Sequence, residues 1–356
     1  MRTLHPWIIF FAACLAACAA PPPPAAHPTY DVLIDTDLGG DPDDIQSLYR
    51  LVHYSDVLHV RGIVSTPCRD SVGHPWDTLP QVSLIQTWIT RIDVEHLRDR
   101  GYTALMPEDS LLTRVKAGSQ QPGPPRPGGA TEGSRWIAAA AASQPADRPL
   151  WVLVWGSLTT VVQALHDAPE IAGRIRIYSI GSTNTLHDSL SRRYLLDFME
   201  TQYPGLWWIE NGTLPKGRYE TFRGVYQGGD QTETWGNQAF VATHIRGHGS
   251  THNGMFAERC GDVFPVATSP AGTLKEGDSP SMLYLLSPVL AQIGDVDDPT
   301  RPSWGGQFRL ADSLRFPHYY IDLDLPPKQC QATISQWRRD FLADWAARWD
   351  RYGDAP

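Results

Sequence analysis

The sequence has no excess of basic residues and no long basic run. Its 356 residues include 30 Lys and Arg against 39 Asp and Glu, which gives a formal net charge of -9. Proteins bind phosphate backbones through clustered Lys and Arg side chains. We therefore expect no nucleic acid among its partners, and a small molecule or an uncharged polymer fits this composition better.

Cysteine is scarce as well, and its spacing does not suit a metal site. The five cysteines include no CxxC pair, the close spacing that is common among structural zinc ligands. Past the N-terminal segment, Cys68, Cys260 and Cys330 allow one disulfide and one free thiol, or no disulfide. Their pairing stays open, and we assign them no chemistry.

The N-terminal apolar run is too short to span a bilayer as a helix of the mature protein. It extends from Trp7 to Ala17 behind Arg2, and such a segment is typical of a secretory signal peptide. The sequence LAAC at 15–18 resembles a bacterial lipobox, in which Cys18 becomes the lipidated first residue of the mature chain. A plain secretory signal with an incidental cysteine is the alternative.

The lipobox predicts both the division of the chain and its location. Residues 1–18 would be the signal peptide, 19–29 a Pro-rich linker, and 30–350 a single folded domain. Acyl chains on Cys18 would hold the protein in the cell envelope, at the periplasm or the outer membrane, after export across the inner membrane. The oligomeric state stays open.

From residue 30 onward, strand-like apolar runs alternate with helical patterns. The expected strands are 30–36, 57–65, 149–157 and 174–182, and the expected helices include 43–55, 135–142 and 159–172. This alternation predicts an α/β fold with a mostly parallel central sheet and helices on both faces.

Aspartates crowd the end of the first expected strand, in the sequence LIDTDLGGDPDD (33–44). Ligands of a parallel sheet bind outside the carboxyl ends of its strands. Carboxylates that converge there would repel each other without a cation, and hard oxygen ligands favour Ca²⁺ or Mg²⁺. The alternative is a turn followed by an acidic helix start, because Asp and Gly are common in turns and Asp suits the helix dipole.

The acidic stretch resembles the N-terminal DTDxGxDD signature of the calcium-dependent nucleoside hydrolases, with two extra residues before the final DD. Further segments are similar to one branch of that superfamily, the nucleoside-hydrolase-like domain of secreted bacterial proteins first named from a cellulose-binding protein. The resemblance runs from about Tyr30 to Trp349. The similar segments are HVRGIVST (59–66), TEGSRWI (131–137), PLWVLVWGSLTT (149–160), YPGLWWIEN (203–211), TFRGVY (221–226), EGDSPSMLYLL (276–286) and PSWGGQF (302–308).

The resemblance implies a role for each acidic residue. Asp37 matches the aspartate that binds Ca²⁺ and acts as general base, Asp44 the bidentate metal ligand, and Asp43 the carboxylate that holds the ribose hydroxyls. Trp155 would give its backbone carbonyl to the metal. Asp278 would be the late aspartate ligand, although the usual His-Asp pair reads Gly-Asp in this chain.

Other positions depart further from the nucleoside hydrolases. No Asn follows the second strand, where the family binds ribose, and Asn184 only loosely echoes a later Asn loop. Glu210 and Asn211 would replace the sugar-binding Glu and Asn. These departures favour a substrate other than an ordinary nucleoside.

The histidines at 244, 248 and 252 allow three interpretations. Interrupting glycines disfavour a helix that would align them for zinc, so a structural polar loop and an acid/base or sugar-contact role for His248 are the alternatives.

Tryptophan is abundant, and aromatic faces stack on sugar rings. We expect Trp304, with Trp207 and Trp208, at the rim of the site, where Trp304 would contact a glycan. The spacing of Trp337, Trp345 and Trp349 instead predicts one face of an amphipathic helix.

Two function classes remain. The first is a Ca²⁺-dependent hydrolase of N-glycosidic or related glycosyl bonds that acts on a small glycoside or carbohydrate. The second is a non-catalytic lipoprotein that binds a cellulose-like glycan and retains a structural metal site. The set Asp37, Asp43, Asp44 and Asp278 favours the enzyme, because a binding module has little need for a general base.

Overall fold

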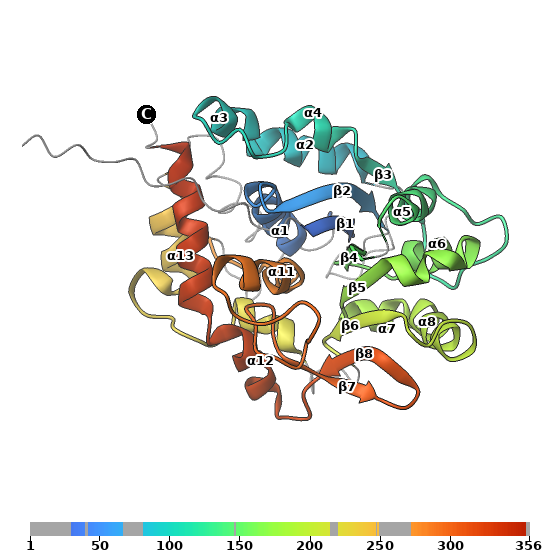
Figure 1. Ribbon diagram of the computed structural model, residues 1–356. Helices are drawn as coiled ribbons and strands as arrows, with labels where there is room; N and C mark the ends of the chain where they lie inside the picture. The colour runs from blue at the N-terminus through green and yellow to red at the C-terminus, as the bar shows by residue number, and fades with distance from the viewer. Residues whose placement is uncertain are drawn as a thin grey trace, which may run out of the picture.

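A computed structural model of the protein describes residues 30–39, 42–66, 81–145, 147–213, 220–246, 248 and 272–353. Its centre is an eight-stranded sheet in the order β3-β2-β1-β4-β5-β6-β8-β7, parallel throughout except for β7, which runs antiparallel to β8 (Figure 1). The predicted mostly parallel α/β fold is confirmed. The strands are β1 (Tyr30–Thr36), β2 (Leu58–Ser65), β3 (Val115–Ala117), β4 (Leu150–Val154), β5 (Ile175–Ile180), β6 (Trp207–Asn211), β7 (Phe308–Asp312) and β8 (Phe316–Asp322).

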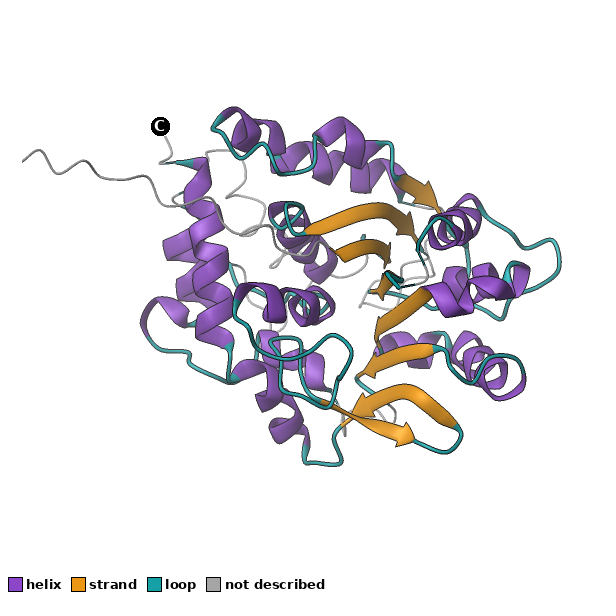
Figure 2. Cartoon of the chain, in the orientation of Figure 1, coloured by secondary structure: helices purple, strands orange, loops and turns teal. Residues whose placement is uncertain are grey.

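Helices cover both faces of the sheet (Figure 2). They are α1 (Pro42–His53), α2 (Val82–Ile92), α3 (Val94–Asp99), α4 (Glu108–Leu112), α5 (Glu132–Ala142), α6 (Thr159–Asp167), α7 (Thr183–His187), α8 (Ser189–Thr201), α9 (Asn237–Phe240), α11 (Pro280–Leu290), α12 (Pro327–Ser335) and α13 (Arg338–Trp349). Short 3-10 turns lie at η1 (Pro169–Arg174), η2 (Thr221–Val225), η3 (Glu233–Trp235) and η5 (Asp350–Tyr352), and a π-helical turn at η4 (Val241–Ile245).

Alternation along β1 divides the core into two layers, as expected for a strand buried on both faces. Val32 and Ile34 pack in the layer that contains α1, α2, α11 and α13. Leu33 packs on the other side, with α5, α6 and α8. Helices α1 and α11 therefore lie on one face of the sheet, and α5 lies on the opposite face.

Two helix predictions were too long. The expected helix at 159–172 ends at Asp167, and a 3-10 turn follows from Pro169, whose ring removes a backbone donor. The C-terminal amphipathic segment is divided between α12 and α13. Trp337 lies at that division, whereas Trp345 and Trp349 are fully buried along α13.

Cys330 is a buried free thiol, and Cys18, Cys68 and Cys260 lie outside the described residues. Among the helices that the structure describes, none is long and apolar enough to cross a bilayer.

Candidate functional site

Three acidic side chains from two segments meet beyond the carboxyl end of β1. Asp43 and Asp44 begin α1, and Asp278 precedes α11. One carboxylate oxygen from each of the three lies within 4.8 Å of the others. Asp44 and Asp278 are buried, whereas Asp43 stays partly exposed. Residues more than 200 positions apart in the chain therefore form one acidic cluster.

Asp37 joins this cluster from the turn after β1. It packs against Gly156, where a Cβ would lie 2.8 Å from the Asp37 Cβ and Cγ atoms. Its carboxyl group also shares a hydrogen bond with that of Asp44. Asp37 as a residue is partly exposed, and its carboxyl group lies beside the loop that follows β4.

The cluster has more carboxyl groups than it can ionise without a counter-charge. Burial raises the pKa of Asp37 and of Asp43 to about 7, and the charge of Asp43 adds to the shift of Asp37. The pKa values of Asp44 and Asp278 are raised well above the ordinary range, first by burial and then by the neighbouring carboxylates. Among the described residues, Asp278 Oδ2 is buried without a hydrogen-bond partner. A divalent cation would offset these costs.

Backbone and hydroxyl donors hold the acidic residues in place. Thr36 Oγ1 donates to Asp44 Oδ1 and accepts from the Leu38 N–H at 3.1 Å. The Gly277 N–H donates to the Asp43 carboxylate, which opposes the rise in its pKa. A Cβ at position 277 would meet Asp43 Oδ2. The glycine of this Gly-Asp pair therefore leaves room for the Asp43 carboxylate to lie close to the backbone.

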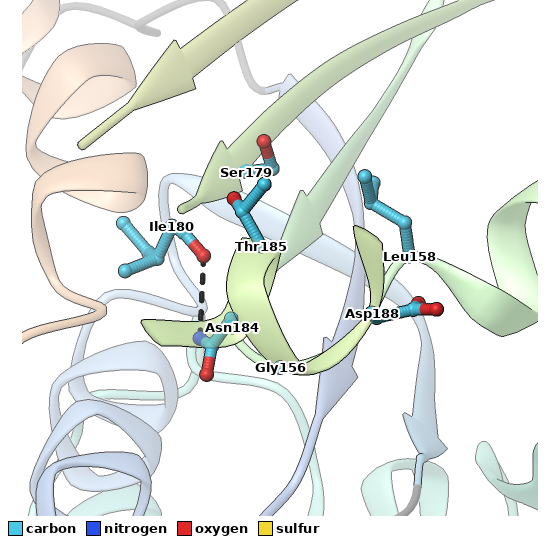
Figure 3. A pocket seen from close by; sticks show the side chains of 7 residues that line it. All are labelled: Gly156, Leu158, Ser179, Ile180, Asn184, Thr185 and Asp188. Carbon is cyan, nitrogen blue, oxygen red and sulfur yellow. Dashed lines mark hydrogen bonds between the residues drawn. The ribbon is translucent and has the colours of Figure 1, made fainter. Parts of the chain in front are cut away.

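Asn184 supports the Trp155 carbonyl. Its Nδ2 donates to Trp155 O at 2.6 Å and to Ile180 O at 3.2 Å, the second bond being drawn in Figure 3. A carbonyl oxygen has two lone pairs, so Trp155 O keeps one for another partner. Gly156 and Asn184 also line a small polar cavity at the ends of β4 and β5, with space for about one water molecule.

Residues 31–308 match the family model described as cellulose-binding Sde182, nucleoside hydrolase-like domain. The chain belongs to this family. The resemblance carried by the short motifs is thereby confirmed.

Solved structures agree with this assignment at the level of the fold. A nucleoside hydrolase-related hypothetical protein from Saccharophagus degradans, associated with carbohydrate metabolism, superposes on the Sde182-like domain with a TM-score of 0.62 at 19% identity, covering 92% of this chain and 73% of that one. The effector protein XOO4466 gives a TM-score of 0.52 at 14% identity, covering 90% and 94%. No curated protein gave a significant sequence match.

The expected sugar contacts on β6 are not seen in the Sde182-like domain. Glu210 is fully buried and paired with Arg192 through two bonds of 2.7 and 2.9 Å, and it also accepts from Thr185 and Tyr319. Asn211 is fully buried as well, and its Nδ2 donates to the hydroxyl of a core tyrosine at 2.9 Å. In the described part of the chain, both side chains therefore hold core elements together and do not face a ligand site.

The aromatic rim expected from the sequence is not present either. Trp304 is only 3% exposed, and its backbone N–H donates to Ser287 Oγ at 3.1 Å. Trp207 and Trp208 are buried in the two core layers. The glycines beside Trp304 let the loop pack tightly onto α11, since a Cβ at Gly305 would collide with that helix.

His248 lies away from the acidic cluster. Its Nε2 is 2.9 Å from Oδ1 of Asp350. Asp350 is in the same 3-10 turn as Tyr352, and the Tyr352 hydroxyl forms a hydrogen bond with His53, the last residue of α1. Asp44 begins the same 12-residue helix, whose length is about 18 Å. The geometry therefore does not support a role for His248 at the acidic cluster. His244 stacks on a tryptophan, and the third histidine of the zinc hypothesis lies outside the described residues.

Two residues near the site carried no prediction. Burial lowers the pKa of Lys275 to about 8, against the opposing effect of Asp278 and Asp37. Phe222 lies 3.6 Å from the Cβ position of Gly277, so an aromatic ring borders the acidic cluster. Phe222 lies in the family-like segment TFRGVY, and Lys275 directly precedes EGDSP. No sequence pattern distinguished either side chain as part of a site.

Proposed function

We propose that this domain is a calcium-dependent hydrolase of N-glycosidic or related glycosyl bonds, with Asp37 as general base. The acidic cluster carries the proposal. Its carboxylate oxygens from Asp43, Asp44 and Asp278 lie within 4.8 Å of one another at the carboxyl end of a parallel sheet, where such folds bind ligands.

The residues present fit a hard divalent cation. Asp37, Asp44 and Asp278 would hold it with carboxylate oxygens, and Trp155 with its backbone carbonyl. The unpartnered Asp278 Oδ2 and the mutual repulsion of the carboxylates support this fit. Such a donor set suits Ca²⁺, with Mg²⁺ as the second candidate. When bound, the ion would supply a water of lowered pKa.

The chain's own side chains would then do the proton transfer and the orientation. Asp37 lies beside Gly156, and its pKa of about 7 suits a group that would accept a proton from such a water. Asp43 is partly exposed, and the Gly277 N–H fixes its carboxylate while leaving acceptor sites for sugar hydroxyls. Negative charge in the cluster would stabilise an oxocarbenium-like transition state.

A non-catalytic glycan-binding protein with a structural metal site is the second candidate. The burial of Glu210 and Asn211 weakens the hydrolase candidate, because two residues expected to hold the sugar of its substrate lie in the core. The family description as cellulose-binding supports the binding protein.

A substrate screen with matched variants separates the two candidates. The purified domain is incubated with nucleosides and with cell-wall and plant oligosaccharides, with and without a chelator, and product is measured by chromatography. Asp37→Asn should abolish turnover while keeping ligand binding, and the exposed control Asp197→Asn should behave like the natural chain. Glycan binding without any turnover, unchanged by Asp37→Asn, would establish the binding protein instead.

We also propose that acyl chains on Cys18 anchor the protein in the cell envelope. The lipobox sequence and the Pro-rich linker support this. Cys18→Ser should move the protein from the membrane fraction to the soluble fraction. Unchanged retention in the membrane fraction would overturn the anchor.

A further inference from the structure

A groove of about 470 Å³ opens at the β3 edge of the sheet, away from the acidic cluster. It is lined by Arg61 of β2, by Thr113 and Arg114 before β3, and by Trp136, Ala139, Ala140 and Ser143 of α5. Its volume lies in the range of small-molecule sites. Arg61 is four residues before the end of β2, and α5 covers the face opposite α1 and α11.

The aromatic wall of this groove is held rigidly. Trp136 Nε1 donates to Arg61 O at 2.9 Å, and the indole lies so close to β2 that a Cβ at Gly62 would be 2.8 Å from its ring atoms. The Lys116 ammonium lies 4.5 Å from the ring centroid. The motifs HVRGIVST and TEGSRWI therefore meet at this groove, and the proposed reaction uses neither of them.

The groove is positively charged in a chain of net charge -9. Its lining contains two guanidinium groups and no carboxylate. Arg61 is 3.7 Å from Asp31, but Asp31 is shared with His59 at 2.8 Å and Arg148 at 3.1 Å. The Arg61 charge is therefore only partly neutralised.

Arg114 is the more available of the two cations. Its Nη1 donates to Ser110 O at 2.6 Å, and it forms no ion pair with a carboxylate of the described residues. Arg61 and Arg114 both line the groove, and burial and then the like charge of Arg61 lower the pKa of Arg114. A bound anion would remove this repulsion.

We propose that the groove binds an acidic saccharide, a sugar ring that carries a carboxylate. The carboxylate would lie between Arg61 and Arg114, because the planar guanidinium fork matches it with two parallel hydrogen bonds. The ring would pack against the Trp136 indole, which provides the apolar wall. An inorganic anion would make no contact with the indole, and a neutral sugar would not neutralise the two guanidinium charges. An acidic saccharide does both.

Calorimetry with the mature protein tests this assignment. The probes are a short oligogalacturonate, cellobiose and inorganic phosphate. The oligogalacturonate should bind, and Arg114→Gln should weaken its binding by roughly tenfold or more, the effect of losing a charge-assisted hydrogen bond. Arg114→Lys should recover part of the affinity, since it restores charge without the fork. The exposed control Arg193→Gln should leave binding unchanged.

Binding of the oligogalacturonate that persists in Asp44→Ala and in chelator supports a site separate from the acidic cluster. Equal binding of phosphate, equal binding of cellobiose, or affinity that Arg114→Gln leaves unchanged would each overturn the acidic-saccharide assignment. Thermal unfolding of Arg114→Gln, expected to match the natural chain, distinguishes a lost contact from a lost fold.

Discussion

Removal of the Asp44 side chain should take away most of the stabilisation that Ca²⁺ gives the folded protein. Oxygens of Asp43, Asp44 and Asp278 lie within 4.8 Å of one another. Two unit charges at about that separation repel by roughly 3.5 kcal/mol at an effective dielectric near 20. Three ionised pairs would cost about 10 kcal/mol, as much as the whole stability of a typical domain. Without a cation the carboxyl groups must therefore retain protons, as their raised pKa values indicate.

The size of the Ca²⁺ effect follows from mass action. At a concentration about 100 times Kd, a ligand that binds only the folded state stabilises it by about 2.7 kcal/mol, or roughly 5 °C in Tm for a domain of this size. Scanning calorimetry after chelation and after Ca²⁺ addition measures this shift. Asp44→Ala should lose most of it, whereas the mostly exposed Asp350→Ala should keep it. The shift should grow as the pH rises from about 5 to 8, because the cation displaces protons from its ligands.

One result would refute this reasoning. If elemental analysis finds no bound cation, and neither Ca²⁺ nor Mg²⁺ changes Tm, the acidic stretch is a turn and a helix start without a metal. A shift that Asp44→Ala retains would place the cation elsewhere in the protein.

Three further variants test the surroundings of the site. Glu210→Gln should cost about 3 kcal/mol in urea denaturation, because it leaves the Arg192 guanidinium without its buried carboxylate, and the Ca²⁺ response should stay. Asn184→Ala should weaken Ca²⁺ binding about tenfold in calorimetry, because the Trp155 carbonyl loses the donor that orients it. Burial raises the pKa of Asp322 to about 7, so its stabilising contribution is full below about pH 4 and is lost as the pH rises through 7. Asp322→Asn should therefore flatten the fall in stability between pH 4 and 8, by up to about 4 kcal/mol; an unchanged pH profile would contradict this.

Strands β1, β2, β4 and β5 and the acidic stretch after β1 could be predicted because their signals are local, whereas β3, β6, β7 and β8 carried no prediction. The run YDVLIDT has the bounds of β1 as the structure has it, since a strand buried on both faces is continuously apolar. Asp37 and Asp44 follow at the strand end, where the fold class itself predicts a ligand site. The family motif then connected Asp278 to them across more than 200 residues.

The polar and aromatic surroundings could not be predicted, because long-range partners decide them. Nothing near Glu210 in the sequence shows that Arg192 of α8 and Tyr319 of β8 will enclose it. Trp304 lies among glycines, which is typical of an exposed loop, yet those glycines allow the close packing that buries its ring. The division of the last helix near Trp337 has no Pro or Gly to mark it.

The contact between Gly277 and Asp43 couples these two positions in the acidic cluster. A side chain at position 277 would meet Asp43 Oδ2, so a Gly277→His substitution that restored the usual His-Asp pair would also require the Asp43 side chain to turn aside. That movement would disturb the hydrogen bond by which the Gly277 N–H now holds the Asp43 carboxylate. The residue at position 277 therefore helps to set where the Asp43 carboxylate lies.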